Sequence, residues 1–284
     1  MLTSKFSKPH PNTGKKRSVN VKKILAILSS LLLLTLTVSA FAADGSFKRV
    51  KKEGTLTIGL DDAFPPMGYR NDKGQLVGFD IDAAEEVGKR LGIKIKWQPT
   101  AWDGVMHALN SKKFDCIWNG MTITEDRKKE VAFTKPYKMD GQVAVVRFGE
   151  KKFKKLADLK GAKVGVQKGS SAVEAVKKLP AAPAEVREYE DNPKALLDLE
   201  SKRLDTVVID DATGRDFISK RPGKFQIIPG NITKEPFGVA FRKEDVELRQ
   251  AVQKTLDGMV KDGTMAKISK KWFGEDITNP KKWK

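Results

Sequence analysis

Residues 115–127, DCIWNGMTITEDR, change from a strand pattern to a helix pattern within a few positions. Phe114, Cys116 and Trp118 stand at alternate positions, which places them on one face of an expected strand. Gly120 then interrupts the pattern, and its lack of a Cβ lets the backbone approach another group closely. The stretch therefore predicts a strand that ends at a tight turn and leads into a helix.

The turn that follows this strand has the composition of an anion site. Thr122 or Thr124 is expected to cap the helix, and the free N–H groups of a helix N-terminus favour negative charge. Arg127 stands about one turn into the helix and can donate two hydrogen bonds to a carboxylate. The same arginine could instead pair with Glu125 or Glu130 on the surface. The stretch alone leaves the carboxylate-binding elbow and the surface ion pair as open alternatives.

Strands and helices alternate on the N-terminal side of this stretch. Strands are expected over 55–60 and 93–97, and a further helix begins at Trp102. Between the two strands, the capping-box pattern of 82–85 predicts a helix start and Gly92 its end. This order predicts a mostly parallel α/β sheet. In such sheets ligands bind beyond the carboxyl ends of the strands, where Asp61, Phe64 and Asn119 stand.

A second α/β unit begins near Val143. The expected strand over 162–166 runs into Gln-Lys-Gly-Ser-Ser at 167–171 and then into a helix, which repeats the pattern of an anion-binding elbow. The apolar strand over 206–209 ends at Asp210, where a carboxylate could meet a ligand cation. Both features also occur as ordinary helix caps, so neither is specific alone.

The N-terminus has the three parts of a secretory signal peptide. Residues 1–23 hold seven basic and no acidic residues, and 24–43 are uncharged and mostly apolar. Ala40-Phe41-Ala42 matches the small-residue cleavage pattern, so residues 1–42 are expected to be removed during export. The apolar run could also span a bilayer as an uncleaved anchor. We expect a soluble periplasmic protein.

Composition excludes several classes of function. The 284 residues carry a net charge of +18, and 47 basic against 36 acidic residues, or +11, remain without the seven N-terminal charges. These lysines are scattered, not interleaved with aromatic residues as in a nucleic-acid groove, and export also makes nucleic acid an unexpected partner.

Motifs of metal, cofactor and nucleophile chemistry are missing. His10, His107 and Cys116 cannot build a metal cluster, and Cys116 is expected to be a small buried apolar residue. The sequence contains no G-x-S-x-G, phosphate-binding loop or H-E-x-x-H motif. No metal, cofactor or catalytic residue is expected, which favours binding over catalysis.

Six stretches together resemble the polar amino-acid family of periplasmic solute-binding proteins of ABC importers. They occur in order over nearly all of the chain beyond the expected signal peptide: 59–66, 76–82, 121–127, 131–137, 164–171 and 237–243. The resemblance implies a two-lobed periplasmic-binding-protein fold (type II), an α/β fold in which helices flank a mostly parallel sheet in each lobe.

The resemblance also implies how the chain is divided. Lobe 1 would comprise 43–140 and 237–284, with its last helices over 245–261 and 267–273, and lobe 2 would comprise 141–236. Two hinge strands are expected near 138–143 and 235–238. The ligand would lie between the lobes, which close over it as a monomer that delivers an amino acid to the membrane permease.

Carried over residue by residue, the resemblance implies a clamp for a zwitterion. Arg127 would bind the ligand's carboxylate, helped by Thr122 and the Gly120 backbone on lobe 1 and by Ser171 on lobe 2. Asp210 would bind the α-ammonium. The predicted ligand-binding residues are Asp61, Phe64, Trp102, Asn119, Gly120, Met121, Thr122, Arg127, Gln167, Ser170, Ser171 and Asp210.

The identity of the ligand's side chain stays open at this point. Phe64 would cover the ligand, and Asp61, with Trp102 and Trp118, could hold a cationic side chain. Asn119 and Gln167 could equally serve glutamine or a cystine-like ligand. A dehydratase-like enzyme on the same scaffold and a ligand-sensing module are the two alternative functions.

Overall fold

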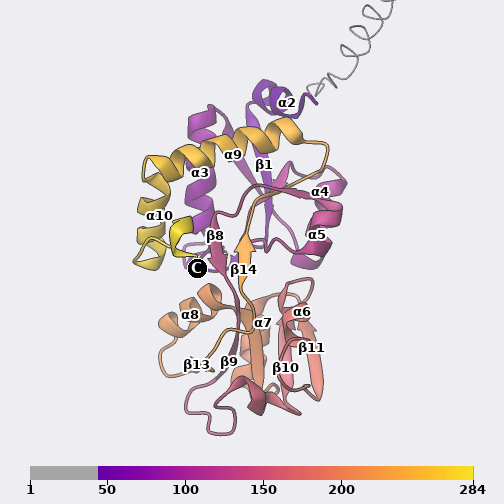
Figure 1. Ribbon diagram of the computed structural model, residues 1–284, viewed down its shortest axis with the longest axis vertical. Helices are drawn as coiled ribbons and strands as arrows, with labels where there is room; N and C mark the ends of the chain where they lie inside the picture. Colours follow the sequence, from indigo (N-terminus) through magenta and orange to yellow (C-terminus); the bar gives the residue numbers. More distant parts are fainter. Residues whose placement is uncertain (1–43, 284) are drawn as a thin grey trace, which may run out of the picture. The chain divides into compact units, whose positions relative to one another are not determined.

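The computed structural model describes residues 44–283, so the expected signal peptide over 1–42 lies outside the described residues. Within 44–283, no helix combines the length and the apolar composition that a membrane crossing requires. The described chain builds two sheets, each covered by helices, and crosses between them twice (Figure 1).

The first lobe is organised around a five-stranded sheet with the order β5-β1-β6-β15-β7. Its strands are β1 (Thr55–Leu60), β5 (Lys94–Pro99), β6 (Cys116–Ile117), β7 (Ala132–Phe133) and β15 (Ala240–Phe241). Strand β1 runs parallel to β5 and β6, whereas β15 runs antiparallel to β6 and β7. The last strand comes from the C-terminal part of the chain, so this lobe is assembled from two separate segments.

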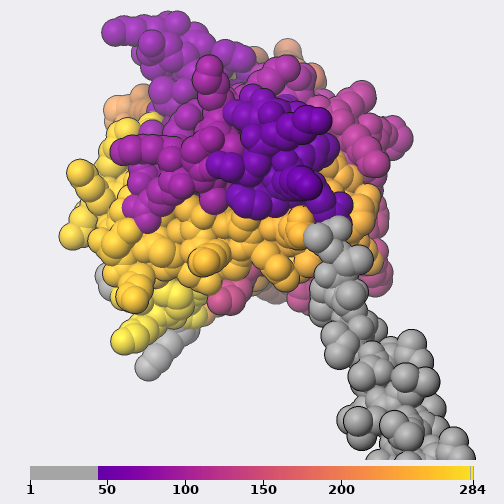
Figure 2. All heavy atoms as spheres, turned by 90° about the horizontal axis from the view of Figure 1, so that it is seen from above, coloured from indigo at the N-terminus to yellow at the C-terminus, as the bar shows by residue number. Residues whose placement is uncertain are grey.

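The helices of the first lobe flank this sheet. They are α2 (Ser46–Glu53), α3 (Phe79–Leu91), η1 (Trp102–Gly104), α4 (Val105–Asn110), α5 (Glu125–Glu130), α9 (Val246–Lys261), α10 (Thr264–Phe273) and η3 (Pro280–Lys282). A small antiparallel sheet is formed by β2 (Ala63–Phe64), β3 (Gly68–Arg70) and β4 (Leu76–Val77). The backbone N–H of Leu248 donates to Ser46 Oγ, and Figure 2 shows the N-terminal and C-terminal segments of the lobe packed side by side.

The second lobe contains a five-stranded sheet with the order β11-β10-β12-β9-β13. Its elements are β9 (Gln142–Arg147), η2 (Leu156–Leu159), β10 (Lys163–Gln167), α6 (Ala172–Val176), β11 (Glu185–Tyr189), α7 (Asn192–Glu200), β12 (Thr206–Asp210), α8 (Asp211–Lys220) and β13 (Phe225–Ile227). Alternate residues of β9 enter different cores: Val143 and Val145 pack on one face, Ala144 and Val146 on the other. A strand buried on both faces needs a continuous apolar run, which explains the Val-Ala-Val-Val sequence.

Two short strands join the lobes. Strands β8 (Lys138–Asp140) and β14 (Glu235–Phe237) pair antiparallel, with Glu235 opposite Asp140 and Phe237 opposite Lys138. Figure 1 shows them side by side between the two larger sheets. The segments fall where the sequence predicts hinge strands, and the two-lobed α/β architecture confirms the predicted fold class.

Several helix boundaries differ from the sequence prediction. Helix α3 begins at Phe79 after Gly78, three positions before the capping-box pattern, and Asp82 accepts hydrogen bonds from Lys271 Nζ and Trp272 Nε1. Helix α10 begins at Thr264, before the expected Lys267. The pattern misled because the first turn of α3 buries the charged residue Asp80 completely, which sequence periodicity assigns to the surface.

Candidate functional site

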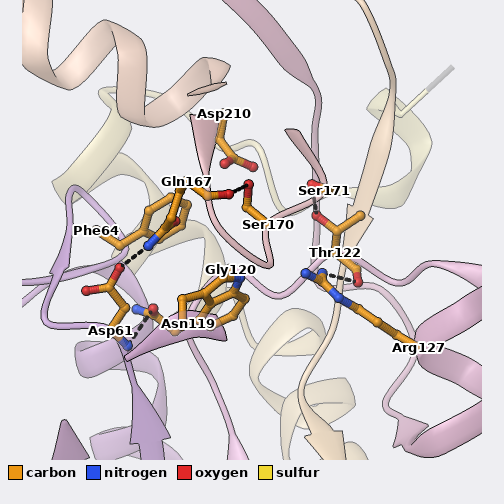
Figure 3. A pocket seen from close by; sticks show the side chains of 11 residues that line it. Asp61, Phe64, Asn119, Gly120, Thr122, Arg127, Gln167, Ser170, Ser171 and Asp210 are labelled. Atoms are coloured by element: carbon orange, nitrogen blue, oxygen red, sulfur yellow. Dashed lines mark hydrogen bonds between the residues drawn. The ribbon is translucent and has the colours of Figure 1, made fainter. Parts of the chain in front are cut away.

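All of the predicted ligand-binding residues except Met121 line one pocket between the two lobes (Figure 3). Its lining comprises Asp61, Phe64, Trp102, Asn119, Gly120, Thr122, Arg127, Gln167, Ser170, Ser171 and Asp210. The pocket lies at the carboxyl ends of strands, because Asp61 follows β1, Gln167 ends β10 and Asp210 ends β12. The topology of the two sheets therefore brings these distant residues together.

Met121 is the predicted residue that the structure places elsewhere. Its side chain is 1% exposed and packs in the apolar cluster of the first lobe with Trp102 and Val105. Its carbonyl oxygen accepts a hydrogen bond from the backbone N–H of Gly238 at 3.0 Å. Strand β6 ends at Ile117, so the alternation of inward and outward side chains does not continue to Met121.

Trp118 also lies outside the pocket. Its indole is fully buried in the core of the first lobe, and its ring centroid is 6.2 Å from that of Tyr137. The sequence interpretation that Trp118 could hold a cationic side chain of the ligand is therefore wrong. A strand buried on both faces explains the error, because Ile117 on the opposite side is also fully buried.

The elbow after β6 depends on Gly120. This residue has a φ of 57°, and a Cβ built there would lie 2.8 Å from Cε1 of Phe64, so a larger residue would displace the aromatic wall of the pocket. Its backbone N–H donates to Asp80 Oδ2 at 2.6 Å. Thr124 is the N-cap of α5, since its hydroxyl accepts from the backbone N–H of Arg127 at 3.1 Å. The elbow is therefore fixed by a glycine, a buried carboxylate and a capping threonine.

Arg127 points from α5 into the region between the lobes. Its guanidinium donates to the carbonyl oxygen of Thr122 at 2.9 Å and to that of Gly169, on the second lobe, at 3.0 Å. The guanidinium also lies 5.7 Å from the ring centroid of Trp102. Burial lowers the pKa of Arg127, while the Asp210 and Glu235 carboxylates oppose this shift.

The alternative of a surface ion pair for Arg127 is excluded. The Lys128 ammonium pairs with Glu125 at 2.7 Å, and the described structure contains no ion pair between Arg127 and either neighbouring glutamate. A guanidinium held by backbone carbonyls and an aromatic face keeps its positive charge available for an anion in the pocket.

Asp210 supplies the opposite charge from the second lobe. It is 7% exposed, and within 44–283 no ion-pair partner is present for its carboxylate. Burial raises the pKa of Asp210 well above its ordinary value, and the neighbouring Asp140 and Glu235 carboxylates add to the shift, whereas Lys138 opposes it. A carboxyl group in this environment favours any cation that enters the pocket.

Glu235 contacts the pocket wall, and sequence reasoning missed it. This glutamate begins β14, is 7% exposed, and its Oε2 accepts from Ser171 Oγ at 2.6 Å and from Thr122 Oγ1 at 2.9 Å. The two hydroxyl oxygens are also 3.1 Å apart, although they belong to different lobes. The sequence places Glu235 in an expected hinge strand, but no local pattern indicates that its side chain reaches the pocket wall.

A second polar group closes the other end of the pocket. The Gln167 amide donates to Asp61 Oδ2 at 2.7 Å across the two lobes, and the backbone N–H of Ala63 donates to Asp61 Oδ1 at 2.9 Å. The Asn119 side chain accepts from the backbone N–H of Asp61 at 3.0 Å and so fixes this loop. Burial raises the pKa of Asp61, although the hydrogen bonds from the Ala63 backbone and the Gln167 amide oppose the shift.

The pocket holds no candidate metal centre. Within 44–283, no group of three or more histidine, cysteine or acidic residues has a geometry that could hold a metal ion. Cys116 is buried in the first-lobe core, as expected from its sequence context, and burial raises the pKa of its thiol well above the ordinary value. The chemistry of the pocket therefore rests on opposite charges, hydroxyls and aromatic faces.

Comparisons with known proteins agree with this geometry. The family model of bacterial extracellular solute-binding proteins, family 3, matches residues 56–275. The L-cystine-binding protein TcyJ of Escherichia coli (strain K12) is 35% identical over 256 residues, which cover 90% of this chain and 96% of the relative. The chain therefore belongs to the family 3 extracellular solute-binding proteins, which confirms the resemblance found in the sequence.

Solved structures support the same family. An ancestral arginine-binding protein bound to arginine has 43% sequence identity and a TM-score of 0.74, and covers 78% of this chain and 99% of its own. An ancestral amino acid-binding protein, a precursor of cyclohexadienyl dehydratase, has 39% identity and a TM-score of 0.74, with coverage of 80% and 99%. The fold is thus shared with binding proteins and with the precursor of an enzyme.

Proposed function

We propose that this protein binds a polar L-amino acid between its lobes and delivers it to the membrane permease of an ABC importer. The observation that carries the proposal is the pair of opposite charges on opposite sides of one pocket, Arg127 from the first lobe and Asp210 from the second. A zwitterion that loses its hydration needs both of its ends compensated. Because the two charges come from different lobes, both contacts form only when the lobes are closed.

The ligand's carboxylate and ammonium are assigned to the two ends of this pair. The carboxylate lies against Arg127, with Thr122, Ser170 and Ser171 close by, and the α-ammonium lies against Asp210. Charge-assisted hydrogen bonds contribute about 1.5–3 kcal/mol each. Micromolar affinity requires about 8 kcal/mol, so a few of these bonds with the aromatic cover of Phe64 are sufficient.

A cationic side chain is the first candidate for the ligand. Two carboxylates, Asp61 and Asp210, line the pocket against one guanidinium, so a ligand with a second positive charge balances the site better than a neutral one. Asp61 lines the same pocket as Phe64 and Trp102, whose aromatic rings favour a cation. Glutamine and cystine remain the alternatives, because Asn119 and Gln167 offer amide groups at the same end.

Binding without turnover is part of the proposal. Each carboxylate in the pocket has a binding role, Asp210 toward the ammonium and Asp61 toward the side chain, which leaves no acid free for proton transfer to a substrate. The similarity to an ancestral amino acid-binding protein that is a precursor of cyclohexadienyl dehydratase makes enzymatic activity the alternative. Incubation with candidate substrates and analysis of the products separates the two, since a binding protein returns its ligand unchanged.

The cellular context follows from the N-terminal sequence and the hinge strands. We infer that the signal peptide is cleaved after Ala42 and that the exported chain acts as a monomer in the periplasm. Lobe 1 then comprises 43–140 and 237–284, and lobe 2 comprises 141–236. N-terminal sequencing of the exported form tests the cleavage, and a start at Met1 would contradict it.

A thermal-shift screen of the mature protein against the amino acids tests the function directly, because a ligand that binds only the native state raises the midpoint of unfolding. Isothermal titration calorimetry of the hit then measures variants. Arg127→Ala and Asp210→Ala should each weaken binding by at least about tenfold, the loss of one charged hydrogen bond.

Matched controls keep this test specific. Arg203 and Asp257 have largely exposed side chains that are 66% and 53% accessible, so their alanine variants should bind like the parent protein. Unchanged affinity in both Arg127→Ala and Asp210→Ala would falsify the clamp.

The side-chain assignment has its own test at Asp61. Asp61→Asn removes the charge but keeps the shape, so arginine should bind about tenfold more weakly while glutamine changes little. Equal losses for both ligands in calorimetry would show that Asp61 organises the pocket without recognising a cation.

A further inference from the structure

Glu235 occupies an unusual place for a buried carboxylate. It lies in the strand that joins the lobes, yet one oxygen, Oε2, accepts from a hydroxyl of each lobe: Thr122 at 2.9 Å and Ser171 at 2.6 Å. The Gln142 amide approaches the same oxygen at 3.4 Å, and Thr233 Oγ1 donates to the other oxygen at 2.7 Å. The glutamate therefore ties both lobes and both connecting segments to one group.

The number of hydroxyl protons limits what Thr122 and Ser171 can do. Each hydroxyl donates one hydrogen bond only. The 3.1 Å contact between the two hydroxyls uses one proton at most, and any proton given to Glu235 is not available to a molecule in the pocket. Thr122 and Ser171 line the pocket beside Arg127, where the proposed function places the ligand's carboxylate.

Glu235 thus presents the same chemical group as the ligand's carboxylate to the same two hydroxyls. A charged acceptor forms hydrogen bonds about twice as strong as a neutral one, so the hydroxyls favour a carboxylate partner. Its charge also acts on Arg127, because the Glu235 carboxylate is one of the two that oppose the burial effect on the pKa of that arginine. The Glu235 carboxylate and the ligand's carboxylate therefore compete for the same guanidinium and for the same two hydroxyl protons.

We propose that Glu235 is an internal competitor for the ligand's carboxylate, a positioning residue that holds the two lobes together through Thr122 and Ser171 until the ligand takes these hydroxyls. All members of this cluster are protein groups, so the cluster can close the lobes by itself. The proposal rests on the proposed amino-acid binding for its ligand, but the closing action of Glu235 does not depend on it.

The competitor has a cost in affinity and in speed of binding. A ligand enters an open cleft, so the apparent association rate falls with the fraction of molecules that the Glu235 cluster holds closed. The bound carboxylate also lies near the Glu235 charge, which weakens binding further. If Glu235 only braced the ligand-bound form, its removal would have the opposite effect and weaken binding.

The sign of the effect is tested with Glu235→Gln, which keeps the shape of the side chain and removes its charge. We expect the association rate and the affinity for the amino acid found in the screen to rise by about tenfold, as measured by stopped-flow fluorescence and calorimetry. Glu235→Ala, which leaves no side chain in the cluster, should change both in the same direction. Weaker binding in either variant overturns the proposal.

Glu125→Gln is the matched control. Glu125 carries the same charge and lines the same surface pocket as Glu235, but its side chain is 85% exposed. Its substitution should leave the association rate and the affinity unchanged within about twofold. An increase equal to that of Glu235→Gln would show that any lost negative charge nearby is sufficient, which also overturns the proposal.

A second measurement needs no ligand. Lys73 and Ser219 are exposed residues of the first and second lobe, and the nearby contact of the Lys220 ammonium with the Tyr69 ring, 4.1 Å, places them across the gap between the lobes. Spin labels on Lys73→Cys and Ser219→Cys report the lobe separation by pulsed electron paramagnetic resonance, since native Cys116 is buried. Glu235→Gln should shift ligand-free protein toward longer distances.

An unchanged distance distribution overturns the proposal, whether or not an amino acid binds. Absence of binding to any amino acid by the parent protein contradicts the proposed function instead. The two failures are therefore distinguishable, because the distance measurement depends only on the contacts among Thr122, Ser171 and Glu235.

Discussion

The two lobes present their charges to the pocket in opposite ways. On the first lobe, the Arg127 guanidinium donates to two backbone carbonyls and faces the Trp102 ring. On the second lobe, the Asp210 carboxylate is more deeply buried than Arg127, but within the described residues no cation pairs with it. One charge is held in place by the protein, whereas the other lacks a counter-charge of its own.

This difference means that one lobe orients the ligand, whereas the other supplies free energy for binding it. Groups that are already hydrogen-bonded bind a ligand with little rearrangement, because their orientation is fixed beforehand. A buried carboxylate without a partner is costly, and a ligand ammonium that pairs with it removes that cost. The first lobe therefore sets the orientation of the ligand's carboxylate. The second lobe supplies much of the free energy of closure, because its buried carboxylate pairs with the ligand's ammonium.

Asp210→Asn should have the largest effect on ligand binding, because it removes the buried carboxylate that has no counter-charge within residues 44–283. Removing one partner of a buried charge pair costs about 2–5 kcal/mol, so ligand affinity should fall at least about thirtyfold in calorimetry. The same change removes an unpaired buried charge, so the ligand-free variant should unfold at a higher temperature than the parent, by several degrees in differential scanning calorimetry. A lower midpoint would mean that the Asp210 charge is compensated within the protein.

The pH dependence of ligand binding should report the protonation of the Asp210 carboxyl. The pKa of Asp210 is raised, by burial first and by Asp140 and Glu235, so this carboxyl keeps its proton to a higher pH than an ordinary aspartate. A bound ammonium favours the ionised carboxylate, so binding should release protons and affinity should rise with pH. Calorimetry in buffers of different ionisation enthalpy measures this release. Asp210→Asn should abolish it, and equal release in both proteins would assign the protons to another group.

The first lobe also contains a buried carboxylate, Asp80, whose charge is only partly compensated. Asp80 accepts from the backbone N–H of Gly120 at 2.6 Å and from Tyr137 Oη at 3.0 Å, which links the elbow to the segment that enters the hinge. Burial raises its pKa from 3.8 to about 7, although these hydrogen bonds and Lys138 oppose the shift. The ionised form of Asp80 is therefore energetically disfavoured in the folded protein near neutral pH.

Asp80→Asn should remove a pH dependence of stability. Because the folded pKa is the higher one, Asp80 stabilises the fold below pH 4, and this contribution declines as pH rises from about 4 through about 7. The ceiling is about 4 kcal/mol for a shift of this size. Relative to the variant, the parent protein should lose thermal stability between pH 4.5 and 8. Parallel profiles of unfolding midpoint against pH would contradict the assignment.

Much of the fold could be predicted because local patterns carried it. Strands β1, β10 and β12 are apolar runs that end at polar turns, so both the strands and the residues at their carboxyl ends were accessible from sequence. The elbow was also local, since a glycine, a capping threonine and Arg127 stand within eight positions. The division into two lobes, and the placement of the two elbows on one ligand site, were inferred from the family resemblance.

The rest depended on contacts that local patterns do not contain. The hydroxyls of Thr122 and Ser171 are 49 positions apart, and Glu235 is 113 positions from Thr122. Burial of Asp80 contradicts the surface preference of aspartate, so the start of α3 was displaced toward Asp82. Trp118 was considered as a contact for a cationic side chain because it stands beside Asn119, and the sequence does not show that both faces of this strand are buried.

The smallest expected effect concerns the exposed contact between the lobes. The Lys168 ammonium lies 2.9 Å from the Asp103 carboxylate, with side chains that are 58% and 39% exposed. If the buried charges decide closure, as the comparison of the lobes implies, Lys168→Ala should weaken ligand binding by at most about threefold. Screening should reduce even this difference at high ionic strength.

Lys177→Ala is the control, because Lys177 pairs with Glu174 within the second lobe and is similarly exposed at 67%. Calorimetry of both variants at low and high salt measures how much the ion pair between the lobes contributes to ligand affinity. A loss above about tenfold for Lys168→Ala alone would assign the closure energy to the rim of the cleft. Arg127 and Asp210 would then determine only the orientation of the ligand. Exposed charges at the rim would determine the equilibrium between the open and closed lobes.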